Sequence, residues 1–261
     1  MRTRFGKFYA AATTGAALSI AAFGSQAGEN AMNSKYIERV APLIATNQNQ
    51  WLENDLWQRE ALSSRDRSIV TLSALIARGQ LDAMPKIVEK ALASDVTPEE
   101  IAEIINHLAF YTGFANARAA IAAIGPVYEA HDIKAKQLPS DKLELLSYDK
   151  KAEQQRREFV DSNYGEVSPG TVSYTTEALF MDLWLRPGLA PRDRSLATVS
   201  ALVATGQVEQ VNFHLNKAMD NGLTETEAGE VITQIAFYSG WPKAFSALPV
   251  FKEIFANRKD E

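Results

Sequence analysis

The chain has 261 residues, of which 46% are hydrophobic, carries a formal net charge of −5 and contains no cysteine. This is the composition of a folded protein, and it excludes disulfides and every reaction that needs a thiol. The acidic balance repels nucleic acid and anionic membranes, so we expect neither as a partner.

The N-terminus has the pattern of a secretory signal peptide. A basic start, MRTRFGKF, precedes the apolar or small run YAAATTGAALSIAAFG, and SQA then ends at Ala27. These features are typical of a cleaved signal, and the run is short for a membrane span. We therefore expect residues 1–27 to be removed, which leaves 24 basic and 32 acidic side chains. The mature protein would be periplasmic or secreted, with no membrane partner.

An internal repeat organises the rest of the chain. Residues 55–80 align without a gap on residues 182–207, at an offset of 127, and 16 of these 26 positions are identical. Such a match indicates a tandem duplication. We predict a first repeat at 36–130, a linker at 131–157 and a second repeat at 158–256.

Within each repeat the apolar residues recur at helical spacing. One helix is predicted to begin at the Ser cap in SSRDRS and to end at Gly79, and its counterpart ends at Gly206. Further helices are predicted over 208–221 and from Thr224, where Glu227 completes a capping box. No segment alternates convincingly with period two. We therefore predict an all-α fold whose short loops connect antiparallel neighbours in helical bundles.

Three stretches of the second repeat carry a resemblance to a known family: LWLRPGLAPRDRSLATVSALVATGQ, FHLNKAMDNGLTETEAGEVI and IAFYSGWPKAFSALPVFKEIF. They resemble the carboxymuconolactone decarboxylase family, which shares its fold with the alkylhydroperoxidase D-like proteins. The first repeat matches more loosely, through RDRSIVTLSALIARGQ and INHLAFYTG. The resemblance implies two tandem all-α repeats and a homo-oligomer, most simply a trimer of tandem chains, with sites at interfaces.

The peroxidase chemistry known from one branch of this fold is excluded here. The resemblance places that branch's CxxC on Gln207 and Gln210 and its proton-relay Glu on Ser195, and only the histidine remains, as His214. Glutamines cannot cycle through a disulfide. The sequence instead follows the decarboxylase branch, which implies a reaction without metal or organic cofactor.

His214 is the principal catalytic candidate. Its counterpart in the first repeat is Ile87, and the chain holds only three histidines. A pKa near ~6.5 suits proton transfer at neutral pH, such as delivery of a proton to carbon after CO2 leaves. His107, whose counterpart is Gln234, is a second candidate, and whether the two histidines line one pocket or two stays open at this point. His131 is interpreted as a surface residue.

A polar and aromatic stripe on one helix of each repeat suggests a pocket wall, because residues four apart share a helix face. We expect the stripe of the second repeat to shape the pocket of His214. Arg186, in a loop, is a candidate for binding an anionic group, whereas the RDRS arginines are interpreted as ion pairs at helix starts or assembly contacts. Trp241 and Phe114, each just after a helix-ending glycine, are expected to cap the pocket or to pack in the core. The substrate-binding candidates are Glu103, Tyr111, Arg186, Glu230, Gln234, Tyr238 and Trp241.

The sequence thus predicts a cofactor-free decarboxylase-like lyase that acts on a small acidic or conjugated, lactone-like molecule by histidine acid/base catalysis. The alternative is a non-catalytic ligand-binding or assembly protein on the same scaffold. No metal site is expected, because the three histidines lack ligand spacing.

Overall fold

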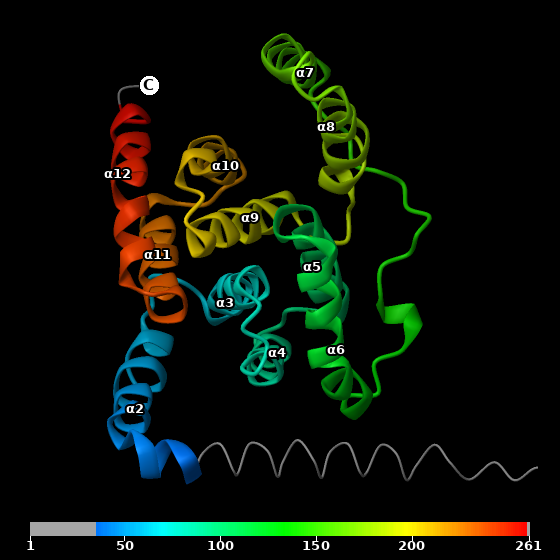
Figure 1. The fold of residues 1–261 in the computed structure, drawn as a ribbon. Helices are drawn as coiled ribbons and strands as arrows, with labels where there is room; N and C mark the ends of the chain where they lie inside the picture. The colour runs from blue at the N-terminus through cyan, green and yellow to red at the C-terminus, as the bar shows by residue number, and fades with distance from the viewer. Residues whose placement is uncertain (1–34, 260–261) are drawn as a thin grey trace, which may run out of the picture. The chain divides into compact units, whose positions relative to one another are not determined.

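The computed structural model describes residues 35–259, and within that range every regular element is a helix. The predicted all-α class is therefore confirmed (Figure 1). One unit of the chain ends at Asp55 and the other begins at Leu56. The predicted signal peptide at 1–27 lies outside the described residues. Nowhere between residues 35 and 259 is a helix both long and apolar enough to cross a membrane.

The first unit contains a helical segment at 35–40, then α2 (Pro42–Asn47) and the π-helical segment η1 (Gln48–Glu53). The second repeat has α8 (Pro169–Tyr174) and η4 (Thr175–Phe180) at the corresponding places, 127 residues later. The duplication therefore extends into this unit.

The second unit holds the other paired elements of both repeats. The first repeat contributes η2 (Leu56–Gln58), α3 (Ser64–Arg78), α4 (Met84–Ala93), α5 (Pro98–Thr112) and α6 (Phe114–Ala130). The second contributes η5 (Leu183–Leu185), α9 (Pro191–Thr205), α10 (Val208–Asp220), α11 (Glu225–Ser239) and α12 (Trp241–Asn257). Between them lie η3 (Ala135–Gln137) and α7 (Lys150–Tyr164).

The helix ends confirm the predicted local signals. Ser63 caps α3 with its side chain, and Thr224 and Glu227 form the capping box at the start of α11. α3 and α9 end at Gly79 and Gly206, which have φ values of 63° and 83°. A positive φ costs glycine little and other residues more, so these two glycines stop the helices.

α3 and α9 pack against each other at the centre of the second unit, and each also packs against α5 and α11 (Figure 1). Twelve of the fifteen residues of each central helix are buried, so neither helix keeps a solvent-facing stripe. Their hydroxyls are satisfied locally: Thr71 and Thr198, for example, donate to the carbonyl oxygens four residues earlier at 2.7 and 2.8 Å.

The RDRS clusters at the starts of α3 and α9 exchange ion pairs, as the sequence indicated. Arg65 lies 2.7 Å from Asp193, and Arg192 lies 2.9 Å from Asp66. The hydrogen bonds that Arg192 donates to Asp66 are the main reason that the pKa of Arg192 is raised. These clusters therefore join the two repeats.

The glycines that end α3 and α9 in the left-handed conformation give a first prediction. Gly79→Ala should lower the free energy of unfolding by about 1 kcal/mol, because alanine is strained at this φ. The added methyl group would not clash, because its nearest neighbour is an Asn116 oxygen at 3.8 Å. Urea unfolding measures the change. Gly125→Ala, at a helical glycine whose added methyl meets no atom within 4 Å, is the control and should not destabilise.

Candidate functional site

Two clusters of equivalent side chains lie where a helix of one repeat meets the core of the other. In the His214 cluster, α5 of the first repeat meets η5, α9 and α10 of the second; in the Gln234 cluster, α11 of the second repeat meets η2 and α3 of the first. The His214 cluster consists of Glu103, His107, Tyr111, Trp184, Arg186, Arg194, Thr198 and His214. The Gln234 cluster consists of Trp57, Arg59, Arg67, Thr71, Glu230, Gln234 and Tyr238.

A fully buried arginine anchors each cluster. Arg194 Nη2 donates to Glu103 Oε2 at 3.2 Å, and Arg67 Nη2 donates to Glu230 Oε2 at 2.9 Å. Burial lowers the pKa of Arg194, and the contact with Glu103 opposes this effect. A buried charge needs such a partner, and here the partner comes from the other repeat. The ion pairs therefore hold the two repeats together.

A second arginine completes each anchor. Arg186 Nε donates to Glu103 Oε1 at 2.8 Å, and Arg59 donates twice to Glu230, at 3.0 and 2.5 Å. Hydrogen bonds from Arg59 and then Arg67 hold the pKa of Glu230 below its usual value. The structure corrects the expectation that Arg186 offers an uncommitted charge to a ligand, because that charge already neutralises a buried carboxylate.

His107 is fully buried and uses both ring nitrogens. Nε2 lies 2.7 Å from the Thr198 hydroxyl, and Nδ1 lies 3.5 Å from Arg194 Nη1. Since the Thr198 hydroxyl donates to the Arg194 carbonyl, its oxygen accepts a hydrogen bond from Nε2–H, which leaves Nδ1 as the acceptor of the imidazole. Burial, followed by the charge of Arg194, lowers the pKa of His107 well below its ordinary value.

Gln234 makes the same two hydrogen bonds in the other cluster. Its Oε1 accepts from Arg67 at 3.0 Å, and its Nε2 donates to the Thr71 hydroxyl at 3.0 Å. An amide thus replaces an imidazole without leaving any of these groups unpaired. This geometry gives His107 the role of a hydrogen-bonding link, which differs from the catalytic role that we expected for it.

His214 has a different environment, made mostly of rings. The Trp184 ring lies nearly parallel to the imidazole with centroids 5.7 Å apart, while Tyr111 and Phe213 meet it edge-on at 5.4 and 5.1 Å. His214 is 7% exposed, and its Nδ1 is enclosed without a hydrogen-bond partner among residues 35–259. Burial, with a smaller effect of Lys217, lowers its pKa to about 4. The imidazole is therefore neutral at pH 7.

The two histidines belong to one cluster, which settles whether they share a site. Tyr111 stacks on His107 at 4.9 Å and also contacts His214, and its hydroxyl accepts from Trp184 Nε1 at 2.9 Å. Burial raises the pKa of Tyr111, so its hydroxyl stays protonated. The ring of Trp184 contacts both imidazoles.

The stripe of the second repeat lies elsewhere than expected. Glu230, Gln234 and Tyr238 contact Arg59, Arg67 and Trp57, and they belong to the Gln234 cluster rather than to the pocket of His214. The same-helix spacing was correct, but the opposing repeat determines which site a stripe enters.

Three further residues complete the comparison with the sequence. Trp241 is 51% exposed and packs against Phe237, while Phe114 is 57% exposed and packs against Phe110, so neither is a core residue. Neither lines the cavity beside His214. His131 is exposed, as predicted, and pairs with Glu89 at 2.8 Å.

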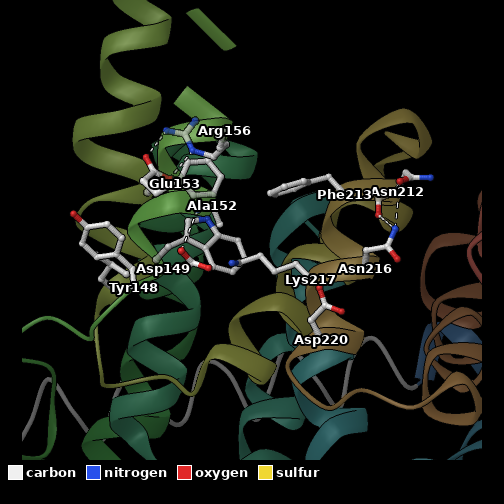
Figure 2. Close-up of a pocket in the computed structure, with 13 residues that line it drawn as sticks. Tyr148, Asp149, Ala152, Glu153, Arg156, Asn212, Phe213, Asn216, Lys217 and Asp220 are labelled. Atoms are coloured by element: carbon white, nitrogen blue, oxygen red, sulfur yellow. Dashed lines mark hydrogen bonds and ion pairs between the residues drawn. The ribbon is translucent and has the colours of Figure 1, made fainter. Parts of the chain in front are cut away.

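A cavity of about 490 Å³ borders the His214 cluster (Figure 2). Trp184 and Phe213, which contact His214, belong to its wall, and Lys217 lies one helical turn after His214 on α10. Within residues 35–259 no three His, Asp or Glu side chains come together in a way that could hold a metal ion. The cavity instead offers aromatic surfaces, a lysine and an imidazole behind them.

Four residues at or beside the site were not predicted as site residues, although the repeat alignment distinguishes them. Trp184, Arg194, Thr198 and Lys217 all have an identical counterpart in the first repeat. The identical residues form the part of the structure that both clusters share, whereas the two histidines occur in one cluster only.

The hydrogen bonds of His107 give a second prediction. His107→Gln should change the free energy of unfolding by no more than about 1 kcal/mol, because the amide can make the two bonds that Gln234 makes. His107→Leu should cost about 2 kcal/mol or more, because it leaves a buried donor on Arg194 and a buried acceptor on Thr198 without the partners they have in the parent. Urea unfolding of both variants at pH 7 tests this, and equal losses would refute the proposed equivalence.

The lowered pKa of His214 predicts acid sensitivity. Between pH 6.5 and 4 the unfolded chain binds a proton at this residue that the folded chain does not, so stability falls as the pH falls through this range. For a folded pKa of about 4, the loss from pH 7 to pH 5 is about 2 kcal/mol. His214→Ile, which copies Ile87, should flatten the pH dependence of the urea midpoint by this amount. Gly125→Ala, which changes no titratable group, should leave the dependence unchanged.

Comparisons with known proteins agree with this architecture. A model of the carboxymuconolactone decarboxylase family matches residues 42–125 and 169–253, one segment in each repeat. The 4-carboxymuconolactone decarboxylase of Acinetobacter baylyi is 35% identical over 93 residues, which are 36% of this chain and 69% of that protein. Nitrosuccinic acid decarboxylase npaB of Metarhizium robertsii is 28% identical over 107 residues, which are 40% of this chain and 75% of that protein. With more than half of its residues matched, in two tandem segments, the chain belongs to the carboxymuconolactone decarboxylase family.

Proposed function

We propose that this protein is a decarboxylase that acts on a small acidic, conjugated or lactone-like substrate at the His214 cluster. The observation that carries the proposal is the enclosed Nδ1 of His214, which has no hydrogen-bond partner in the described part of the chain and lies among aromatic rings that border a cavity. Unpaired buried polar groups are rare and often mark function. Two relatives bear the names of decarboxylases, which supports this class of reaction.

Decarboxylation needs a group that accepts the electron pair of the broken C–C bond and a group that donates a proton. When the bond to the leaving carboxylate breaks, its electron pair passes to the α-carbon and onto the conjugated carbonyl oxygen of the substrate, which gives an enolate and CO2. A proton from His214 then forms the new C–H bond as the electrons return from the oxygen. No cofactor is needed, because the carbonyl of the substrate holds the electrons.

The protonation state of His214 fits this role once an anion is bound. In the protein alone, burial and the charge of Lys217 keep the imidazole neutral. An anionic substrate beside the ring favours the imidazolium, because an opposite charge raises the pKa of a histidine. The aromatic wall excludes water, which strengthens this attraction.

Only one of the two clusters has the groups for this reaction. The Gln234 cluster has the same arginines and hydroxyl, but Ile87 and Gln234 stand where the other cluster has histidines. We therefore propose one catalytic site per chain. The same observation favours a second candidate function, a non-catalytic binding or assembly protein, because it shows that the scaffold persists without an imidazole.

The test is CO2 release by the purified chain from 4-carboxymuconolactone, nitrosuccinic acid and a set of β-keto acids. His214→Asn should lower kcat by about 100-fold or more on every substrate that is turned over, since acid/base groups contribute at least this much. His131→Asn, at an exposed surface site, is the matched control and should keep the parent rate. Parent-level turnover by His214→Asn would remove His214 from the mechanism. Absence of CO2 release from the whole set would favour the binding protein.

A further inference from the structure

The cavity beside His214 lies between α7 and α10, with residues of η4 and η5 in its wall. Figure 2 shows Tyr148, Asp149, Glu153 and Arg156 on one side, opposite residues of α10 that include Lys217. The Phe180 and Trp184 rings are nearly parallel, with centroids 6.1 Å apart, and Phe213 meets Phe180 edge-on at 6.3 Å. The cavity therefore offers flat apolar walls to a ligand of a few carbon atoms.

The carboxylates of this cavity are already paired. Glu153 accepts two hydrogen bonds from Arg156, at 2.8 and 2.7 Å, and Asp220 accepts one from Arg258 at 2.8 Å. Asp149 caps α7 by accepting from two backbone N–H groups of its first turn. None of these acids therefore demands a cation from a ligand.

Lys217 is the cation of the cavity that stays uncommitted. Its Nζ lies 5.0 Å from the centre of the Trp184 ring, and it makes no ion pair within the described part of the chain. Burial lowers its pKa, although Asp220 and Glu153 oppose this effect. In Figure 2 the side chain extends from α10 toward the α7 side of the cavity.

A second donor, on the opposite side of the cavity, has no hydrogen-bond partner within residues 35–259. Arg156 stacks over Phe180 at 4.2 Å and uses Nε and Nη2 for its hydrogen bonds, but its enclosed Nη1 makes none within residues 35–259. Buried donors are almost always paired, so this unpaired donor beside the cavity is an exception that distinguishes this part of the molecule.

We propose that this cavity binds a small planar carboxylate, with the carboxylate on Lys217 Nζ and the unsaturated body against the rings of Phe180 and Phe213. The inference rests on the proposed function only in taking this ligand to be the substrate. A lysine supplies a point charge that suits a carboxylate, and partial burial strengthens the attraction. The volume of about 490 Å³ is more than enough for an acid of about six to eight carbons.

The first repeat supports a special role for this wall. Its residues at the places of Phe180 and Phe213 are Glu53 and Lys86, so these two aromatic rings have no counterpart there. The lysine itself does have one: Lys90 Nζ lies 4.5 Å from the centre of the Trp57 ring. Lys90 is therefore the matched control for a purely structural contact between lysine and tryptophan.

The test is calorimetric titration of the full chain with trans,trans-muconate, a conjugated six-carbon dicarboxylate. Dimethyl muconate and 1,6-diaminohexane serve as neutral and cationic probes of the same length. We expect muconate to bind, the two other probes not to bind, and Lys217→Met to weaken muconate binding by about 10- to 100-fold. Lys217→Arg should retain most of the affinity, and Lys90→Met should match the parent protein.

The outcomes separate this inference from the proposed function. Muconate binding by His214→Asn should still depend on Lys217 even if this variant releases no CO2, so Lys217-dependent binding survives a failure of the decarboxylase proposal. Equal muconate binding by Lys217→Met and the parent would overturn the inference, as would tighter binding of the diamine or the diester than of muconate. The comparison of the three probes on the unmodified protein decides the question even if a variant unfolds.

Discussion

The second unit depends on two buried positive charges. Arg67 and Arg194 lie in the first turns of the central helices and are fully removed from water. A guanidinium in this position is tolerated only next to a carboxylate, and removal of the carboxylate from such a pair typically costs about 3–5 kcal/mol. Each arginine takes its carboxylate from the other repeat, as Glu230 or Glu103. The two repeats therefore share one core, and neither has its charges satisfied alone.

This crosswise pairing also determines the composition of each cluster. Because Glu103 must reach Arg194, the face of α5 that carries His107 and Tyr111 lies against α9 and η5 of the other repeat. Differences between the repeats at two separate sequence positions, His107 against Gln234 and His214 against Ile87, therefore fall together in space. The exchange of His107 for Gln234 preserves the hydrogen bonds, because the amide makes the same two contacts. The exchange of His214 for Ile87 removes the imidazole from the other cluster. A duplicated frame thus came to hold two unlike clusters.

Local features of this fold follow from the sequence, whereas the partners of the helices do not. The caps at Ser63 and Thr224 and the stop at Gly79 depend on nearby residues, and each was predicted correctly. The spacing of Glu230, Gln234 and Tyr238 correctly places them on one helix face. The spacing does not show which helix packs against that face. The packing depends on charged and aromatic residues that lie 163 or more positions away in the sequence.

The electrostatic character of the candidate site was also beyond the sequence. An ordinary histidine pKa was expected for His214, but Trp184, Tyr111 and Phe213 enclose the ring and lower its pKa to about 4. Arg186 looked like an anion site because loop position does not reveal a buried carboxylate nearby. Both differences have the same origin: solvent access is decided by packing between the repeats.

Lys217 and His214 are coupled through space, and this coupling joins the two proposals. They lie three residues apart on α10, on the same side of the helix, and the charge of Lys217 disfavours the imidazolium. A carboxylate on Lys217 neutralises that charge and adds an attraction of its own, so both effects raise the pKa of His214. If both proposals hold, binding and proton uptake occur together: the imidazole is neutral while the cavity is empty and gains its proton when the carboxylate of a substrate binds.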